Sequence, residues 1–150
     1  MKRLSVAALA FAGLATALPA AAQFAKPEDA VKYRQSAMAL QGATLGRVFA
    51  MANGRVPFDA KVAAENLEIV AMLNKLQFSA FVDGSNVGNT KAKPTVWTDK
   101  EKWNAEVTRS QEAVAKLAAA GKTGNADQIK SAVGAVGQSC KSCHDEFRKD

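Results

Sequence analysis

The chain has 150 residues, of which 48% are hydrophobic and 23% are charged. These globular proportions exclude a wholly disordered, collagen-like or fibrous protein, and the length suits a single domain. The 20 Lys and Arg against 14 Asp and Glu give a formal net charge of +6. Because the basic residues form no cluster, this charge does not indicate nucleic-acid binding.

The first 22 residues are typical of a secretory signal peptide. The basic pair Lys2-Arg3 precedes an uncharged apolar stretch over residues 4–18. That stretch is shorter than the ~20 apolar residues a membrane-spanning helix needs, and three alanines at 20–22 supply a small-residue cleavage site. We therefore expect residues 1–22 to be cleaved and the protein to be periplasmic and not embedded in a membrane. An uncleaved N-terminal anchor is the alternative.

The first helix of the mature domain, residues 23–150, is expected to begin near Pro27. Glu28 and Asp29 suit the positive end of its dipole, and Asn53-Gly54 is a termination signal. Its expected apolar face comprises Val31, Met38, Leu45, Phe49 and Ala52.

A second helix is expected to follow Pro57, with Asp59 as its N-cap and its end near Phe81. Residues 83–97 then form the longest connection in the chain, and long structured loops often serve a site. The expected apolar face of this helix comprises Val62, Ile69, Leu73, Leu76 and Ala80.

Two more helices complete the pattern. Thr98 and Glu101 have the spacing of a capping box at the start of the third helix, which is expected to end at Gly121. Asn125 is the expected N-cap of the fourth. Their expected apolar faces comprise Trp103, Val107, Val114 and Leu117, and then Ile129, Val133, Val136, Cys140, Cys143 and Phe147. Four helices with mostly short connections predict an all-α, up-down-up-down antiparallel four-helix bundle.

The only two cysteines and the only histidine lie within one five-residue window, C-x-x-C-H. This is the attachment motif for c-type haem, in which two thiols bind the porphyrin and the histidine binds iron. At ~100° per residue, Cys140 and His144 differ in direction by only about 40° on a helix. The motif predicts one covalent haem c held by Cys140 and Cys143, with His144 as an axial iron ligand.

Other uses of these residues fit less well. A structural zinc site needs four ligands, and this window offers three. A thioredoxin-like pair belongs at a helix N-terminus after a strand, whereas this pair lies late in a helix. A disulfide in a small helical thiol protein stays open, although an i,i+3 helical spacing suits that bond poorly.

Three segments carry a resemblance to a known family: QFAKPEDAVKYRQSA at 23–37, KPTVW at 93–97 and GQSCKSCHDEFRKD at 137–150. With C-x-x-C-H in its last helix, the chain resembles cytochrome c′, the class II c-type cytochromes, over essentially all of 23–150. The resemblance implies an electron carrier or NO- and CO-binding haem protein rather than an enzyme. It also implies a homodimer joined through the first two helices, and it identifies no redox partner.

The resemblance places Met38 over the iron face opposite His144. Met38 can pack there and leave a five-coordinate, high-spin iron open to NO and CO. Alternatively, its thioether can bind the iron, giving a low-spin, six-coordinate, cytochrome c556-like electron carrier. Phe78 and Phe81, together with Phe49, are candidates to seal this distal side.

The resemblance also suggests residues at the edges of the haem. Arg34 and Gln35 resemble a pair that contacts haem propionates, and Arg148 resembles a basic residue that shields the proximal histidine. Lys91 is a weaker candidate for a propionate contact because it lies in the long connection. A haem-based NO-reducing or peroxidase-like enzyme is a further alternative. It would need polar distal groups, and the nearest candidates, Gln41 and Arg47, are expected to point outward.

Overall fold

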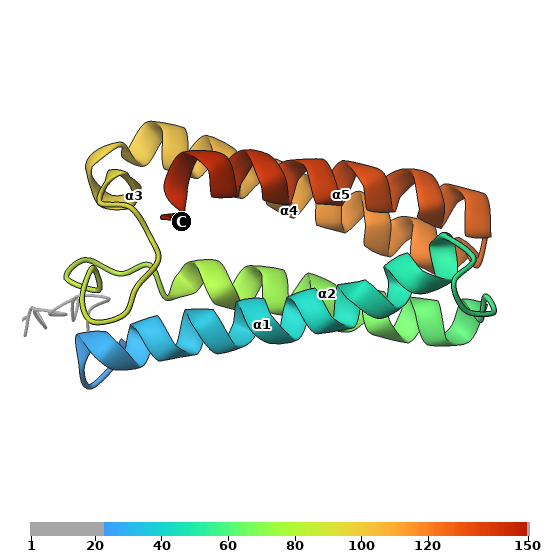
Figure 1. The fold of residues 1–150 in the computed structure, drawn as a ribbon, viewed down its shortest axis with the longest axis horizontal. Helices are drawn as coiled ribbons and strands as arrows, with labels where there is room; N and C mark the ends of the chain where they lie inside the picture. Colours follow the sequence, from blue (N-terminus) through green and yellow to red (C-terminus); the bar gives the residue numbers. More distant parts are fainter. Residues whose placement is uncertain (1–22, 150) are drawn as a thin grey trace, which may run out of the picture.

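The computed structural model describes residues 23–149, and within them it is an antiparallel helical bundle, as predicted. Figure 1 shows α1 (Pro27–Ala52) beside α2 (Ala60–Ser79) in one layer, and α4 (Lys100–Thr123) beside α5 (Ala126–Phe147) in the other. The long connection crosses between the layers at one end and contains a short helix, α3 (Thr95–Thr98), that the sequence did not predict. The C-terminal end of α5 lies at this same end (Figure 1). The expected cleavage of residues 1–22 falls outside the described residues.

Side-chain caps fix two of the helix starts where they were predicted. An Asp59 carboxylate oxygen accepts a hydrogen bond from the Val62 N–H at 2.9 Å. The Asn125 side chain does the same for the Gln128 N–H at 3.0 Å. Each cap satisfies one of the backbone donors that a helix N-terminus leaves unpaired.

The predicted capping box at Thr98 and Glu101 is wrong. Thr98 belongs to α3, and Asp99 is the N-cap of α4, accepting a hydrogen bond from the Lys102 N–H at 3.2 Å. The reason is that Pro94 starts a separate turn, so the helical course breaks at Asp99 rather than before it.

Helix α4 also continues past its predicted end at Gly121. Its C-cap is Gly124, whose φ of +67° is the left-handed conformation that glycine adopts without steric cost. Gly121 instead serves packing, since a Cβ added there would lie 2.7 Å from a Leu67 methyl carbon.

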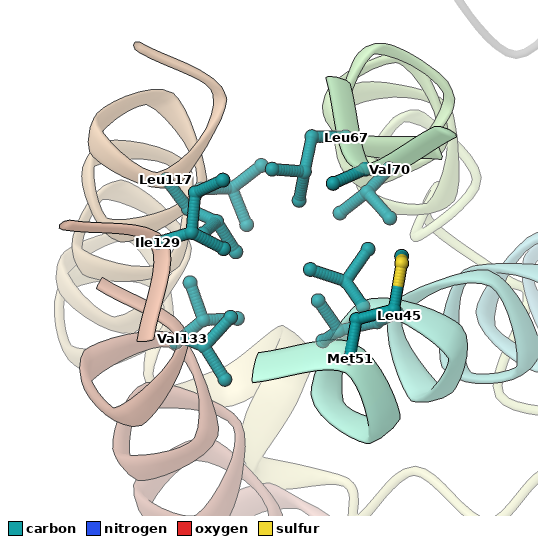
Figure 2. Packing of buried hydrophobic residues seen from close by; sticks show 11 residues of the cluster. Leu45, Met51, Leu67, Val70, Leu117, Ile129 and Val133 are labelled. Atoms are coloured by element: carbon teal, nitrogen blue, oxygen red, sulfur yellow. The ribbon is translucent and has the colours of Figure 1, made fainter. Parts of the chain in front are cut away.

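An aliphatic cluster fills the end of the bundle opposite α3. Figure 2 shows Leu45 and Met51, Leu67 and Val70, Leu117, and Ile129 and Val133 converging from four helices. We call this the aliphatic cluster; its buried members are Leu45, Val48, Met51, Ala63, Leu67, Val70, Val114, Leu117, Ile129, Val133 and Val136. Burial of each aliphatic side chain contributes roughly 1.5–3 kcal/mol, so this cluster is a substantial source of stability.

An aromatic cluster occupies the other end. The Trp103 ring lies 5.2 Å from Phe147, 4.7 Å from Phe81 and 5.9 Å from Phe78, measured between ring centroids. Its buried members are Val96, Trp103 and Phe147, and its half-buried members include Phe78, Phe81, Trp97, Val107 and Cys143. This cluster joins α2, α3, α4 and α5 next to the C-x-x-C-H motif.

The predicted buried face of α2 is largely wrong. Val62, Ile69 and Leu76 are exposed, at 40%, 46% and 38% of their surface, although Leu73 and Ala80 are buried as expected. The helix instead buries the face that carries Ala63, Asn66, Leu67, Val70, Leu73, Asn74 and Gln77. Because α2 has apolar residues on two faces, its periodicity alone did not tell which of them packs inside.

Candidate functional site

Helix α5 brings Cys140, Cys143 and His144 to one stretch of the bundle. Both cysteines are half-buried and free. Cys140 packs against the aliphatic cluster, whereas Cys143 packs against the aromatic cluster. The two thiols therefore lie at the boundary between the clusters, three residues apart on one helix.

Both thiols are protonated at neutral pH. Burial raises the pKa of Cys140, and burial, the charge of Glu106 and the neighbouring Cys140 together raise the pKa of Cys143 to about 11. A nucleophilic or redox-active cysteine needs the opposite shift, because the thiolate is the reactive form. The environment therefore does not favour a thioredoxin-like thiol pair.

His144 lies at the exposed edge of α5, one turn before the end of the helix. Desolvation lowers its pKa, and the positive charge of Arg148 lowers it further against the opposing effect of Asp145. The shift favours the neutral imidazole, which is the form that binds a metal. Two free thiols and a neutral imidazole within five residues fit covalent haem attachment.

The inner side of α1 carries the residues predicted for the opposite face of the iron. Met38 is half-buried. Gln41, one turn further, is 7% exposed, so the expectation that it points outward is wrong, whereas Arg47 is exposed as expected. Gln41 is thus a polar side chain inside the bundle, and its amide oxygen has no hydrogen-bond partner.

Arg34 is the most buried charged side chain of the bundle, at 2% exposure. One guanidinium nitrogen donates to the Ala80 carbonyl at 2.9 Å and to the Ser85 hydroxyl at 2.8 Å. The other donates to the Ser85 carbonyl at 2.7 Å and to the Thr90 hydroxyl at 2.9 Å. The sequence suggested only a propionate contact for Arg34; the structure gives it a further task, which is to tie α1 to the loop after α2.

The surroundings of Arg34 are aromatic rather than acidic. Its guanidinium carbon lies 4.6 Å from the Phe81 ring centroid and 5.6 Å from that of Trp97, and burial lowers its pKa to about 10. Within residues 23–149 no carboxylate forms an ion pair with it. Gln35, its neighbour, is half-buried and donates to the Asn89 carbonyl at 3.3 Å.

The C-terminal tail pairs with the long connection. The Lys149 N–H donates to the Lys91 carbonyl, and the Lys93 N–H donates to the Phe147 carbonyl, both at 2.8 Å. These bonds bring Lys91 and Arg148, both exposed, to the end of α5 that carries His144. The pairing of distant segments explains why sequence reasoning could name both residues but not place them together.

Glu106 is a charged residue that the sequence analysis missed. It is 9% exposed, lies on the inner face of α4 between Trp103 and Ser110, and forms an ion pair with Arg109. The predicted inner face of α4 omitted Glu106 because only apolar residues were included. Its three-residue spacing from Trp103 nevertheless places it on the same face of the helix.

Two structural features are absent from residues 23–149. No helix there combines the length and apolarity that crossing a membrane requires. No group of three or more His, Cys, Asp and Glu side chains there is arranged to hold a metal ion.

Comparison with known proteins places this arrangement in a family. The sequence profile described as Cytochrome C' matches residues 29–148. A cytochrome c' of Rubrivivax gelatinosus is 53% identical over 128 residues, covering 85% of this chain and 99% of that protein. A cytochrome c' of Alcaligenes xylosoxydans xylosoxydans is 42% identical over 127 residues, with 85% and 98% covered.

Solved structures agree with the sequence matches. The crystal structure of the Rubrivivax gelatinosus cytochrome c' matches with a TM-score of 0.83, covering 85% of this chain and 100% of that one. A nitric oxide complex of a leucine-to-alanine mutant of the Alcaligenes xylosoxidans protein matches with a TM-score of 0.81 at 41% identity, with 85% and 99% covered. By sequence and by fold, the chain belongs to the cytochrome c′ family of electron-carrying and gas-binding haem proteins, which carry covalently bound haem c and are not enzymes.

Proposed function

We propose that this protein is a periplasmic mono-haem cytochrome c′ with five-coordinate, high-spin iron, which transfers electrons and binds NO and CO. In this proposal Cys140 and Cys143 hold haem c through thioether bonds, and His144 is the axial iron ligand. The observation that carries it is the place of the C-x-x-C-H motif on α5, where two free, half-buried thiols lie at the boundary of the two clusters and His144 follows them on the same helix.

When bound, haem supplies a reversible one-electron couple and an iron coordination position for a diatomic ligand. The chain supplies the surroundings. Helix α5 would hold the cofactor through Cys140, Cys143 and His144. Met38, Phe78 and Phe81 provide half-buried apolar surface that disfavours water and anions. Small neutral molecules lose little hydration on entering such a site, so NO and CO are the expected ligands.

Relatives support the gas-binding part of the proposal. Alcaligenes xylosoxidans cytochrome c prime has been solved as a nitric oxide complex and, in another variant, with carbon monoxide bound. We propose the same ligands for the present chain because it is 41% identical in sequence to that protein.

Arg34 is proposed to contact a haem propionate. A buried guanidinium without a carboxylate partner lacks a counter-charge, and burying an unpaired charge is costly. A propionate would supply that charge while the loop bonds of Arg34 hold it in place. Gln35 is proposed to contact a propionate together with Arg34. Lys91 is proposed as a weaker propionate contact, and Arg148 as the shield of His144.

We also infer a homodimer joined through α1 and α2. Both helices carry large apolar residues on their outer face: Leu40 is 55% exposed, Met72 63%, Ile69 46% and Leu76 38%. A shallow hollow between the helices, lined in part by Tyr33, Leu40 and Leu76, continues this surface. A second copy of the same face is the simplest cover for it. Leu40→Asp should convert the dimer to monomer in sedimentation experiments, whereas an unchanged mass would exclude this face.

The absorption spectrum of the purified protein tests the central proposal. Broad, merged ferrous bands are expected for five-coordinate iron, and split, sharp bands would instead support Met38 as a sixth ligand. Met38→Ala separates the two directly: the spectrum should remain that of five-coordinate iron, and a change from low to high spin would overturn the proposal. A colourless periplasmic protein, from a host that attaches haem, would refute haem binding itself.

Export is tested on the same sample. The mature chain is expected to begin at Gln23 in the periplasmic fraction, with a mass increased by one haem. Recovery of the intact chain from the membrane fraction would contradict removal of residues 1–22.

A further inference from the structure

Glu106 occupies an unusual position for a carboxylate. It is buried, with 9% of the residue and 11% of its side chain exposed. One carboxylate oxygen pairs with Arg109, but the other, Oε2, is buried without any hydrogen-bond partner. Because an unpaired buried acceptor is costly, such a group calls for an explanation.

The packing of α4 on α5 places Glu106 at the level of the haem-attachment motif. Trp103 packs on Phe147 with 5.2 Å between ring centroids, and an Arg109 nitrogen lies 3.5 Å from the Ser142 hydroxyl. Glu106 is midway between Trp103 and Arg109 on α4. Since the helices are antiparallel, it therefore faces the stretch of α5 between residues 142 and 147.

Two further contacts fix the direction in which this part of α4 faces. On one side of Glu106, Trp103 meets Phe78, and on the other Ser110 accepts a hydrogen bond from Asn74 at 3.1 Å. Both partners belong to α2, across the bundle. Glu106 thus lies on the face of α4 that points to the interior of the bundle, at the level of the C-x-x-C-H motif.

We propose that the negative charge of Glu106 stabilises the ferric over the ferrous haem and so lowers the reduction potential of the protein. The inference rests on the proposed haem attachment at Cys140 and Cys143. Reduction adds one electron to the iron and removes one positive charge from the site. The ferric form can therefore offset the buried carboxylate, and the ferrous form does so less well.

The size of the effect follows from Coulomb's law. Packed helices lie ~10 Å apart, and at an effective dielectric of ~20 a unit charge at that separation changes an equilibrium about tenfold or slightly more. For a one-electron couple, tenfold corresponds to about 59 mV. Arg109 opposes this effect only in part, because its side chain is 57% exposed and screened by water.

The test is a potentiometric titration of the haem-loaded, full mature protein. Glu106→Gln keeps the shape of the side chain and removes its charge. The reduction potential should therefore rise by the amount that corresponds to a tenfold change in the ferric-to-ferrous ratio. Glu112→Gln is the matched control, since it removes the same charge from an exposed position of α4 and should leave the potential nearly unchanged. Equal potentials for the two variants would overturn the inference.

Arg109→Gln adds a test of sign. Removing the cation leaves Glu106 unopposed, so the potential should fall, by less than Glu106→Gln raises it. A structural disturbance would not move the two variants in opposite directions, and a rise in Arg109→Gln would refute an electrostatic role. If Glu106→Gln fails to fold, the sign of the Arg109→Gln shift decides. Absence of haem from the parent protein would instead refute the proposed function, and mass spectrometry distinguishes that outcome.

Discussion

The two ends of the bundle differ in the residues that fill their interior. The end that holds the aliphatic cluster is packed almost entirely from Leu, Ile, Val, Met and Ala. The end that holds the aromatic cluster combines large aromatic rings with two buried charged groups. These groups are the guanidinium of Arg34 and the carboxylate of Glu106. The cysteines lie between the two ends. The comparison indicates that one end stabilises the fold, while the other surrounds the candidate site with charge and aromatic surface.

Replacing both thiols should have the largest effect. In the Cys140→Ala, Cys143→Ala double variant no covalent haem should remain, because the chain has no other cysteine. The measurement is the mass and absorbance of the denatured protein. Ser142→Ala, which lies between the two thiols, is the control and should retain its haem. Covalent haem in the double variant would contradict the assignment of this site.

A cavity at the aliphatic end should lower stability and leave the site intact. Leu117→Ala should reduce the free energy of unfolding by about 2–5 kcal/mol, since Leu117 is fully buried. Denaturant unfolding measures this loss, and the visible spectrum should not change. The exposed Val56→Ala should cost no more than about 0.5 kcal/mol. A loss of the haem spectrum in Leu117→Ala would show that the two ends are not independent.

Removing the buried cation should loosen the other end. Arg34→Met leaves two buried carbonyl acceptors, at Ala80 and Ser85, without their donor. At ~1–3 kcal/mol for each unsatisfied group, a loss of about 2–6 kcal/mol is expected. Hydrogen exchange should become faster in the loop at 80–90 and stay slow around the aliphatic cluster. Uniform acceleration over the whole chain would contradict a local role.

The smallest expected effect concerns a helix start. Asp59→Ala removes the N-cap of α2 and should cost about 1 kcal/mol in unfolding experiments. Asp83→Ala, which breaks an ion pair between exposed side chains, should cost less than about 1 kcal/mol. A larger loss of unfolding free energy in Asp83→Ala than in Asp59→Ala would show that the surface ion pair contributes more than the N-cap.

Much of the fold was readable from local chemistry. The caps at Asp59 and Asn125, the turn at Asn53-Gly54 and the clustered C-x-x-C-H motif depend on residues close together in the chain. Such signals can be recognised in the sequence without knowing which helices pack together. They predicted four long helices, their antiparallel order and the candidate site on the last of them.

Local signals in the chain were therefore enough to locate the long helices and to predict a haem site at the C-x-x-C-H motif, because capping and motif spacing act over a few residues. Which of the two apolar faces of α2 is buried could be read only from the packed fold, because both faces have helical periodicity and the choice depends on the neighbouring helices. It also decided the burial of Arg34 and Glu106. A charged side chain is expected at the surface, unless distant segments supply the carbonyls, hydroxyls and counter-charges that hold it inside.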